Sequence, residues 1–154
     1  MYLVFDMAVD QTQKLDNLIK KSKRTLFEVT TVFPFDFFPD RLRIDEIKVD
    51  IISHEFFFTK HLISIMIKNI NSATMSTGVF FATLNLEVTG FVTGHKVKPY
   101  PVKYLWKKDA IRARRIILGL IAVEKEKIDL SKVHTDHLVP KIEEIGKARE
   151  FPSV

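Results

Sequence analysis

The middle of this 154-residue sequence is a series of short segments in which apolar and polar residues alternate. In the clearest one, Phe81–Val88, the residues Ala82, Leu84 and Leu86 alternate with polar side chains. A period of two is typical of a β-strand, because successive side chains point to opposite faces of a sheet. Only short turns separate the segments, and parallel pairing would need long crossovers. We therefore expect an antiparallel meander.

About six or seven strands are expected in this meander. Five alternating segments run over residues 41–45, 48–58, 61–69, 71–77 and 81–88, and an extended edge segment follows over 95–105. The aromatic stretch TLFEVTTVFPFDFFPD precedes them. Pro34 and Pro39 prevent a regular central strand there, so we expect it to be an extended segment that packs across the core.

Helical patterns flank the strands. A long helix over about 108–127 would cover the apolar face of the meander, and residues 10–24 predict a short amphipathic helix with Asp10 or Thr12 as its cap. The run Ile116–Val123 is apolar in nearly every direction, which indicates a helix covered on two sides. The second cover would be a C-terminal helix with a stripe of Leu138, Ile142 and Ile145, the N-terminal helix, or a second subunit.

Composition excludes several classes of protein. Hydrophobic residues make up 46% and charged residues 28%, as in ordinary globular proteins. The chain has no cysteine, which excludes disulfides, thiolate zinc sites and cysteine nucleophiles. No stretch is long and apolar enough to predict a membrane span, and the N-terminus does not resemble a signal peptide. We expect a cytoplasmic protein, or one peripheral at the membrane.

Positive charge is concentrated in one part of the sequence. Between Lys96 and Ile116 there are eight basic residues and one acid, Asp109, although the whole chain carries only +5. The candidates for binding an anion or a partner are Lys96, Lys98, Lys103, Lys107, Lys108, Arg112 and Arg115. Helical spacing places Lys108, Arg112 and Arg115 on one stripe. Such a stripe either binds phosphate or acidic groups, or is simply a solvated face.

Aromatic residues near the N-terminus suggest a second candidate surface. Phe35, Phe37 and Phe38 would contact a membrane if their loop protrudes beside the basic residues. The alternative is that these rings pack into the core.

Catalytic and metal-binding motifs give little support to an enzyme. His134 and His137 lie three residues apart with Asp136 between them, but a metal site needs further ligands. His54 and His61 could face each other across a hairpin, most simply as a polar cross-strand pair. No nucleophile elbow, zinc-protease motif or phosphate-binding loop occurs. We expect no catalytic residues, no metal and no cofactor.

One known family has this order of elements. The segments FFPDRLRIDEIKVDIISHEFFF and ISIMIKNINSATMSTGVFFATLNLEVTG, followed by the helix KKDAIRARRIILGLIAVEKEK, resemble a pleckstrin-homology-like (PH-like) barrel. The sequence is similar to small bacterial domains of this family, whose functions are largely uncharacterised. The resemblance implies an α+β, mainly β fold, a partly open barrel capped by its C-terminal helix. It does not imply inositol-phosphate binding, because the first hairpin turn, Asp45-Glu46-Ile47, is short and acidic.

The resemblance also suggests how the chain is organised. Residues 1–34 would form a helix and an extended aromatic segment, 35–127 the PH-like barrel with its helix, and 128–154 a helical extension. The function expected is that of a non-catalytic interaction module that binds a protein partner or an anionic membrane surface. The alternative is a nucleic-acid-binding module that uses the same basic residues, with Tyr100, Tyr104 and Trp106 as stacking side chains.

Overall fold

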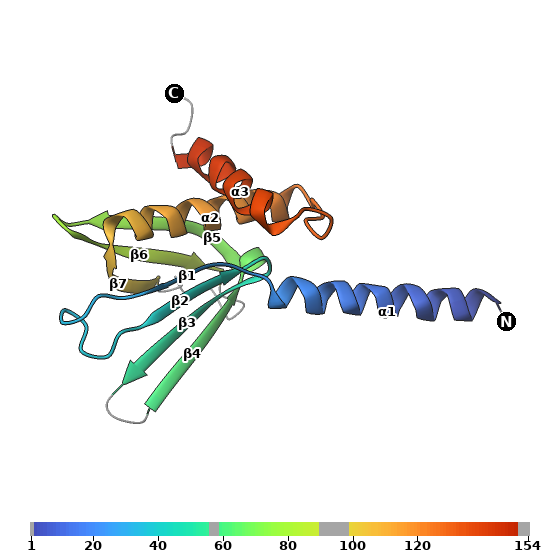
Figure 1. The fold of residues 1–154 in the computed structure, drawn as a ribbon, viewed down its shortest axis with the longest axis horizontal. Coiled ribbons are helices and arrows are strands. Elements are labelled where there is room, and N and C mark those ends of the chain that lie inside the picture. Colours follow the sequence, from blue (N-terminus) through green and yellow to red (C-terminus); the bar gives the residue numbers. More distant parts are fainter. Residues whose placement is uncertain (1, 56–58, 90–98, 151–154) are drawn as a thin grey trace.

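The computed structural model describes residues 2–55, 59–89 and 99–150 of the chain (Figure 1). In these ranges the elements are α1 (Tyr2–Lys23), β1 (Thr25–Thr30), β2 (Arg41–Asp45), β3 (Lys48–Glu55), β4 (Thr59–Met66), the 3-10 helix η1 (Ile67–Asn69), β5 (Ile70–Thr77), β6 (Phe81–Val88), β7 (Tyr100–Trp106), α2 (Lys107–Lys125) and α3 (Thr135–Glu150).

The described strands form two antiparallel sheets and no closed barrel. One sheet has the order β1-β2-β3-β4 and the other the order β5-β6-β7. Consecutive strands pair as the sequence predicts, except at η1, where residues predicted as the end of a strand form a 3-10 turn. Helix makes up 41% and strand 38%, so the expectation of a mainly β chain is corrected to an even α+β mixture.

Strand β1 lies inside the aromatic stretch TLFEVTTVFPFDFFPD, for which an extended segment and no regular central strand are expected, and it is an edge strand of its sheet. It pairs with β2 from Thr25 opposite Asp45 to Thr30 opposite Arg41. Pro34 and Pro39 come after the strand has ended, so they interrupt the following loop and not the ladder. Pro101 lies within β7, which is an edge strand as predicted. The predicted edge residues 95–98 lie outside the described residues.

The core lies between the sheets and α2. The alternation in β6 is confirmed, because Ala82, Leu84 and Leu86 are buried while their neighbours are partly exposed. Leu42 and Ile44 of β2 are fully buried on the other sheet. Burial of such side chains contributes about 1.5–3 kcal/mol each. Figure 1 shows α2 between the three-stranded sheet and α3.

Helix α3 provides the second cover of α2, one of the alternatives that the sequence left open. Leu138 and Ile142 are buried, but Ile145 is 37% exposed, so the predicted stripe is wrong at its third position. The third buried residue of α3 is Gly146, which follows Ile145. A Cβ atom at Gly146 would overlap the backbone of Arg115, and one at Gly119 would overlap the backbone of Ile142. The two helices therefore approach backbone to backbone.

Helix α3 is capped by the residue that precedes it. The carbonyl of His134 accepts the first helical bond, from Leu138 N at 3.0 Å, so His134 is the capping residue. Pro140 lies inside the helix, early in its second turn.

Helix α1 is longer than predicted and projects from the body (Figure 1). It begins at Tyr2 and not near Asp10, because no glycine or proline interrupts the earlier residues. Asp10 and Thr12 are therefore not caps. Asp10 pairs with Lys14 one turn later, and the Thr12 hydroxyl donates to the Ala8 carbonyl at 2.9 Å.

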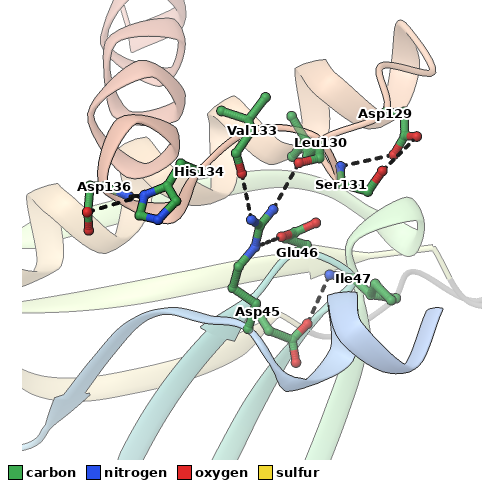
Figure 2. Close-up of polar contacts among 10 residues, drawn as sticks. Asp45, Glu46, Ile47, Asp129, Leu130, Ser131, Val133, His134 and Asp136 are labelled. Atoms are coloured by element: carbon green, nitrogen blue, oxygen red, sulfur yellow. Dashed lines mark hydrogen bonds and ion pairs between the residues drawn. The ribbon is translucent and has the colours of Figure 1, made fainter. Parts of the chain in front are cut away.

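Arg24, at the end of α1, joins three parts of the chain at what we call the Arg24 junction. Its Nε pairs with the buried Glu46 of the β2–β3 turn, and its Nη1 and Nη2 donate to the carbonyls of Val133 and Leu130 at 2.7 and 3.0 Å. Figure 2 shows Glu46 on one side of this junction and the two carbonyls on the other. The junction thus ties α1 to the first sheet and to the α2–α3 loop.

Candidate binding surface at one end of the sheets

Three segments that are distant in sequence meet at the end of the molecule opposite α1 (Figure 1). They are the loop 31–40, the β5–β6 turn and the junction of β7 with α2. Val32 N donates to the Tyr104 carbonyl at 2.9 Å, and Lys107 N donates to the Phe80 carbonyl at 3.3 Å. These backbone bonds hold the three segments together.

Large apolar side chains at this end are unusually exposed. Six of them form a group that we call the aromatic tip: Phe33, Phe35, Phe37, Val79, Phe80 and Trp106. Each of these residues is between 45% and 82% exposed. Phe81 lies beneath the group. Its ring centroid is 4.8 Å from that of Phe35 and 5.0 Å from that of Trp106. Phe35, Phe80 and Trp106 therefore gather around Phe81, and Phe33 lies edge-on to Phe37 in the same loop. Exposed apolar patches commonly mark a site of interaction.

The loop that carries three of these rings is fixed from within. Asp36 accepts a hydrogen bond from the Thr31 hydroxyl at 2.7 Å and another from Phe38 N at 3.2 Å. The Thr31 hydroxyl also accepts from Asp40 N at 2.7 Å. Phe35 and Phe37 are exposed as the membrane-contact hypothesis requires, whereas Phe38 is half-buried.

Three of the predicted basic residues lie beside the aromatic tip. Lys107 and Lys108 begin α2 directly after Trp106, and Lys103 lies on the edge strand that leads to it; all three are exposed. Lys96 and Lys98 lie outside the described residues. These three exposed lysines therefore lie within three residues of Trp106 along the chain.

The other two candidates of the basic stripe are paired with acids of α3. Arg112 Nε lies 3.2 Å from Glu143 Oε2, and its guanidinium lies over the ring of Phe27 at 5.4 Å. Arg115 Nε lies 3.1 Å from Glu150 Oε2, and the other oxygen of Glu150 pairs with Arg114 at 3.1 Å. These acidic partners cannot be predicted from the sequence, because nothing in the helical spacing of α2 identifies the face that α3 covers.

The histidines do not form a site within the described residues. His134 Nδ1 lies 3.2 Å from Asp136 Oδ2, and both side chains are largely exposed. The predicted facing of His54 and His61 is wrong, because His61 is opposite Ser53 in the β3–β4 ladder and His54 therefore points to the other face. In the described ranges, no group of three or more His, Asp or Glu side chains could hold a metal ion.

Asp45 is a buried acidic residue whose pKa is clearly shifted. Burial raises its pKa above the ordinary value of 3.8, although hydrogen bonds from Ile47 N and Lys48 N favour the charged form. These bonds, at 2.9 and 2.8 Å, shape the β2–β3 turn. The turn lies near the Arg24 junction (Figure 2), at the end of the sheet nearer α1 and away from the loop 31–40 (Figure 1).

No protein-family model, curated protein or solved structure matches this chain. Among the described helices, none has both the length and the apolar character needed to cross a membrane. The surface must therefore be interpreted from its own chemistry. Val79 and Phe80 are not among the candidates predicted from the sequence. The signal for them was two apolar residues directly after the Gly78 turn, where polar residues are usual.

Proposed function

We propose that this chain is a non-catalytic, PH-like binding module whose aromatic tip inserts into the surface of an anionic membrane. The order of strands followed by a covering helix supports the PH-like architecture. The single observation that carries the functional proposal is the contact of exposed rings from three segments beside exposed lysines. A membrane interface suits this combination, because rings enter the acyl boundary while amines contact anionic head groups.

The geometry of the tip also favours a shallow attachment. The rings extend from a loop, a turn and a strand end, all at one end of the sheets, so the rest of the chain stays outside the lipid. The lysines contribute about 1 kcal/mol each near an anionic bilayer. The rings add apolar burial at roughly 25 cal/mol per Å² removed from water.

Nucleic-acid binding is the second candidate, and one observation favours it. Tyr100, Tyr104 and Trp106 are each more than a third exposed along the edge strand β7, next to Lys103. Aromatic side chains beside basic ones can stack single-stranded bases. However, Phe33, Phe37 and Phe80 are more exposed than these three and lie beyond the strand, which favours the membrane proposal.

Co-sedimentation with vesicles at low salt tests the proposal. We expect binding to vesicles of phosphatidylcholine with phosphatidylserine, and much weaker binding to phosphatidylcholine alone. A parallel gel-shift assay with single-stranded oligonucleotides tests nucleic-acid binding, the second candidate function. Failure to bind anionic vesicles at low salt would remove the membrane proposal, and a saturable gel shift in its place would favour nucleic acid.

A further inference from the structure

Helix α1 is exposed along most of its length. It projects from the body (Figure 1), and all of its residues from Met7 to Lys20 are exposed. A helix in a protein usually owes most of its stability to the packing of an apolar face. The body of this chain gives that part of α1 little such packing, so a second molecule is needed to supply it.

Large apolar residues gather on one side of α1. Met7, Leu15, Leu18 and Ile19 are each between 48% and 65% exposed. At 100° per residue they fall within roughly 120° of the helix circumference, in a group that we call the α1 stripe. Such a stripe is typical of a helix that packs against another helix. Gln11 falls within the same arc and interrupts the stripe, and a polar residue in an apolar seam lowers the stability of a helix pair.

The charges of α1 are divided between its two halves. Residues 2–13 contain two acids, Asp6 and Asp10, and no basic residue, whereas residues 14–23 contain four lysines and one acid, Asp16. Two α1 helices in antiparallel order therefore set each acidic half against the lysine-rich half of the other. A parallel pair would set lysines against lysines. Charges beside an apolar seam select the orientation of a helix pair in this way.

The charged groups near the middle of α1 are accessible to a second helix. Asp10 and Lys14 pair with each other one turn apart, and each side chain is more than half exposed. A second copy of α1 matches the division of charge in both directions, so the charge pattern identifies the partner as another copy of this chain.

We propose that two copies of this chain pair through their α1 stripes, in antiparallel order about a two-fold axis. The residues near Met7 of one copy then lie against those near Ile19 of the other, and each contact occurs twice. Helix α1 lies at the end of the molecule opposite the aromatic tip (Figure 1). The pairing therefore leaves the tip exposed and does not depend on the membrane proposal.

Sedimentation equilibrium of the full chain at low salt tests the proposal. We expect the mass to rise with concentration toward twice the 17.9 kDa of one chain. Association should weaken at high salt, because the opposed charges are then screened. A chain that stays monomeric at low salt at every concentration would overturn the proposal.

Three variants locate the interface. Leu15→Ser removes an exposed apolar side chain from the stripe of each copy, so it should leave the fold intact and weaken the dimer at least about tenfold. Gln11→Leu makes the stripe continuous and should strengthen the dimer. Val9→Ser is the matched control, because Val9 is 44% exposed but lies outside the stripe, and the affinity should stay unchanged. A dimer unaffected by Leu15→Ser would place the interface elsewhere and overturn the proposal.

Disulfide cross-linking tests the antiparallel order, and the absence of native cysteine makes it specific. The Met7→Cys and Ile19→Cys chains are mixed and oxidised. We expect cross-links mainly between the two different chains, because residue 7 of one copy lies near residue 19 of the other. Cross-links formed mainly between identical chains would indicate parallel helices and would contradict the proposed pairing of acidic and lysine-rich halves.

Discussion

Gly146 lies directly against the backbone of Arg115, with no room between α3 and α2 for even one methyl group. Gly146→Ala must therefore push the helices apart or distort one of them. Overpacking of this kind typically costs about 1–3 kcal/mol, and we expect the upper part of that range because the obstacle is backbone. Urea denaturation would measure the loss in the free energy of unfolding.

Lys147→Ala is the control for this prediction, because it changes an exposed neighbour on the same helix. Its effect should stay within about 0.5 kcal/mol. Equal stability of Gly146→Ala and the wild type would contradict the close packing of α2 and α3.

Arg24 should be the side chain that most strongly fixes α1 to the body. Arg24→Met leaves the buried Glu46 carboxylate without its ion pair and leaves the carbonyls of Leu130 and Val133 without their donor. We expect a loss of about 3 kcal/mol in the free energy of unfolding, as for other broken buried pairs. Chemical denaturation would measure it.

A second variant separates this effect from a general loss of packing. In the double variant Arg24→Met/Glu46→Leu, no uncompensated charge remains buried at this junction. The double variant should therefore be more stable than the Arg24→Met single variant. A double variant less stable than the Arg24→Met single variant would argue against an unpaired Glu46 as the cause.

Asp45 should give the folding stability a specific pH dependence. Because burial raises its pKa in the folded chain above 3.8, the folded state holds the proton more tightly than the unfolded state. The resulting stabilisation is present below pH 3.8 and is lost as the pH rises through the raised pKa. Asp45→Asn stays neutral and can still accept from the amides of Ile47 and Lys48, so it should lack this loss.

The measurement compares the two proteins by urea denaturation from acidic to neutral pH. The stability of Asp45→Asn relative to the wild type should increase with pH, starting near pH 3.8. A relative stability that decreases with pH would mean that the Asp45 carboxylate is stabilised, not destabilised, by its surroundings.

The strand pattern could be predicted from sequence because alternation is local. In β6 the buried positions coincide with the predicted ones, and β2 has the predicted bounds. The break at η1 could not be predicted, because Ile63, Ile65 and Ile67 continue the alternation across it. The stretch that contains β1 is predicted as extended but not as a paired strand, because Pro34 and Pro39 follow it closely.

The candidate surface could be predicted only in part. Exposed rings and lysines are recognisable by type, but burial depends on which element covers them. Phe38 is half-buried while Phe37 is exposed, and Arg115 is paired while Lys108 is exposed. Glu150, which pairs with Arg115, is 35 residues away in the chain. Local spacing carries no information about such a partner.

The exposed lysines should control the electrostatic part of membrane binding. Changing Lys103, Lys107 and Lys108 together to alanine should weaken binding to phosphatidylserine-containing vesicles about a hundredfold, at roughly 1 kcal/mol per lysine. It should also reduce the dependence of binding on salt. The matched control changes Lys125, Lys132 and Lys141, which are exposed in elements away from the tip, and alters the net charge equally. Equal loss of binding in both triple variants would mean that only the net charge matters.

Trp106 offers the most direct test of the aromatic tip, because it is the only tryptophan in the chain and is 45% exposed there. If the tip inserts, vesicles containing phosphatidylserine should shift its fluorescence to shorter wavelength, and brominated acyl chains should quench it. Replacing Phe37 and Phe80 by serine should abolish both effects. Sedimentation with the vesicles without any change in Trp106 fluorescence would show that the chain binds through another surface, and would contradict the central proposal.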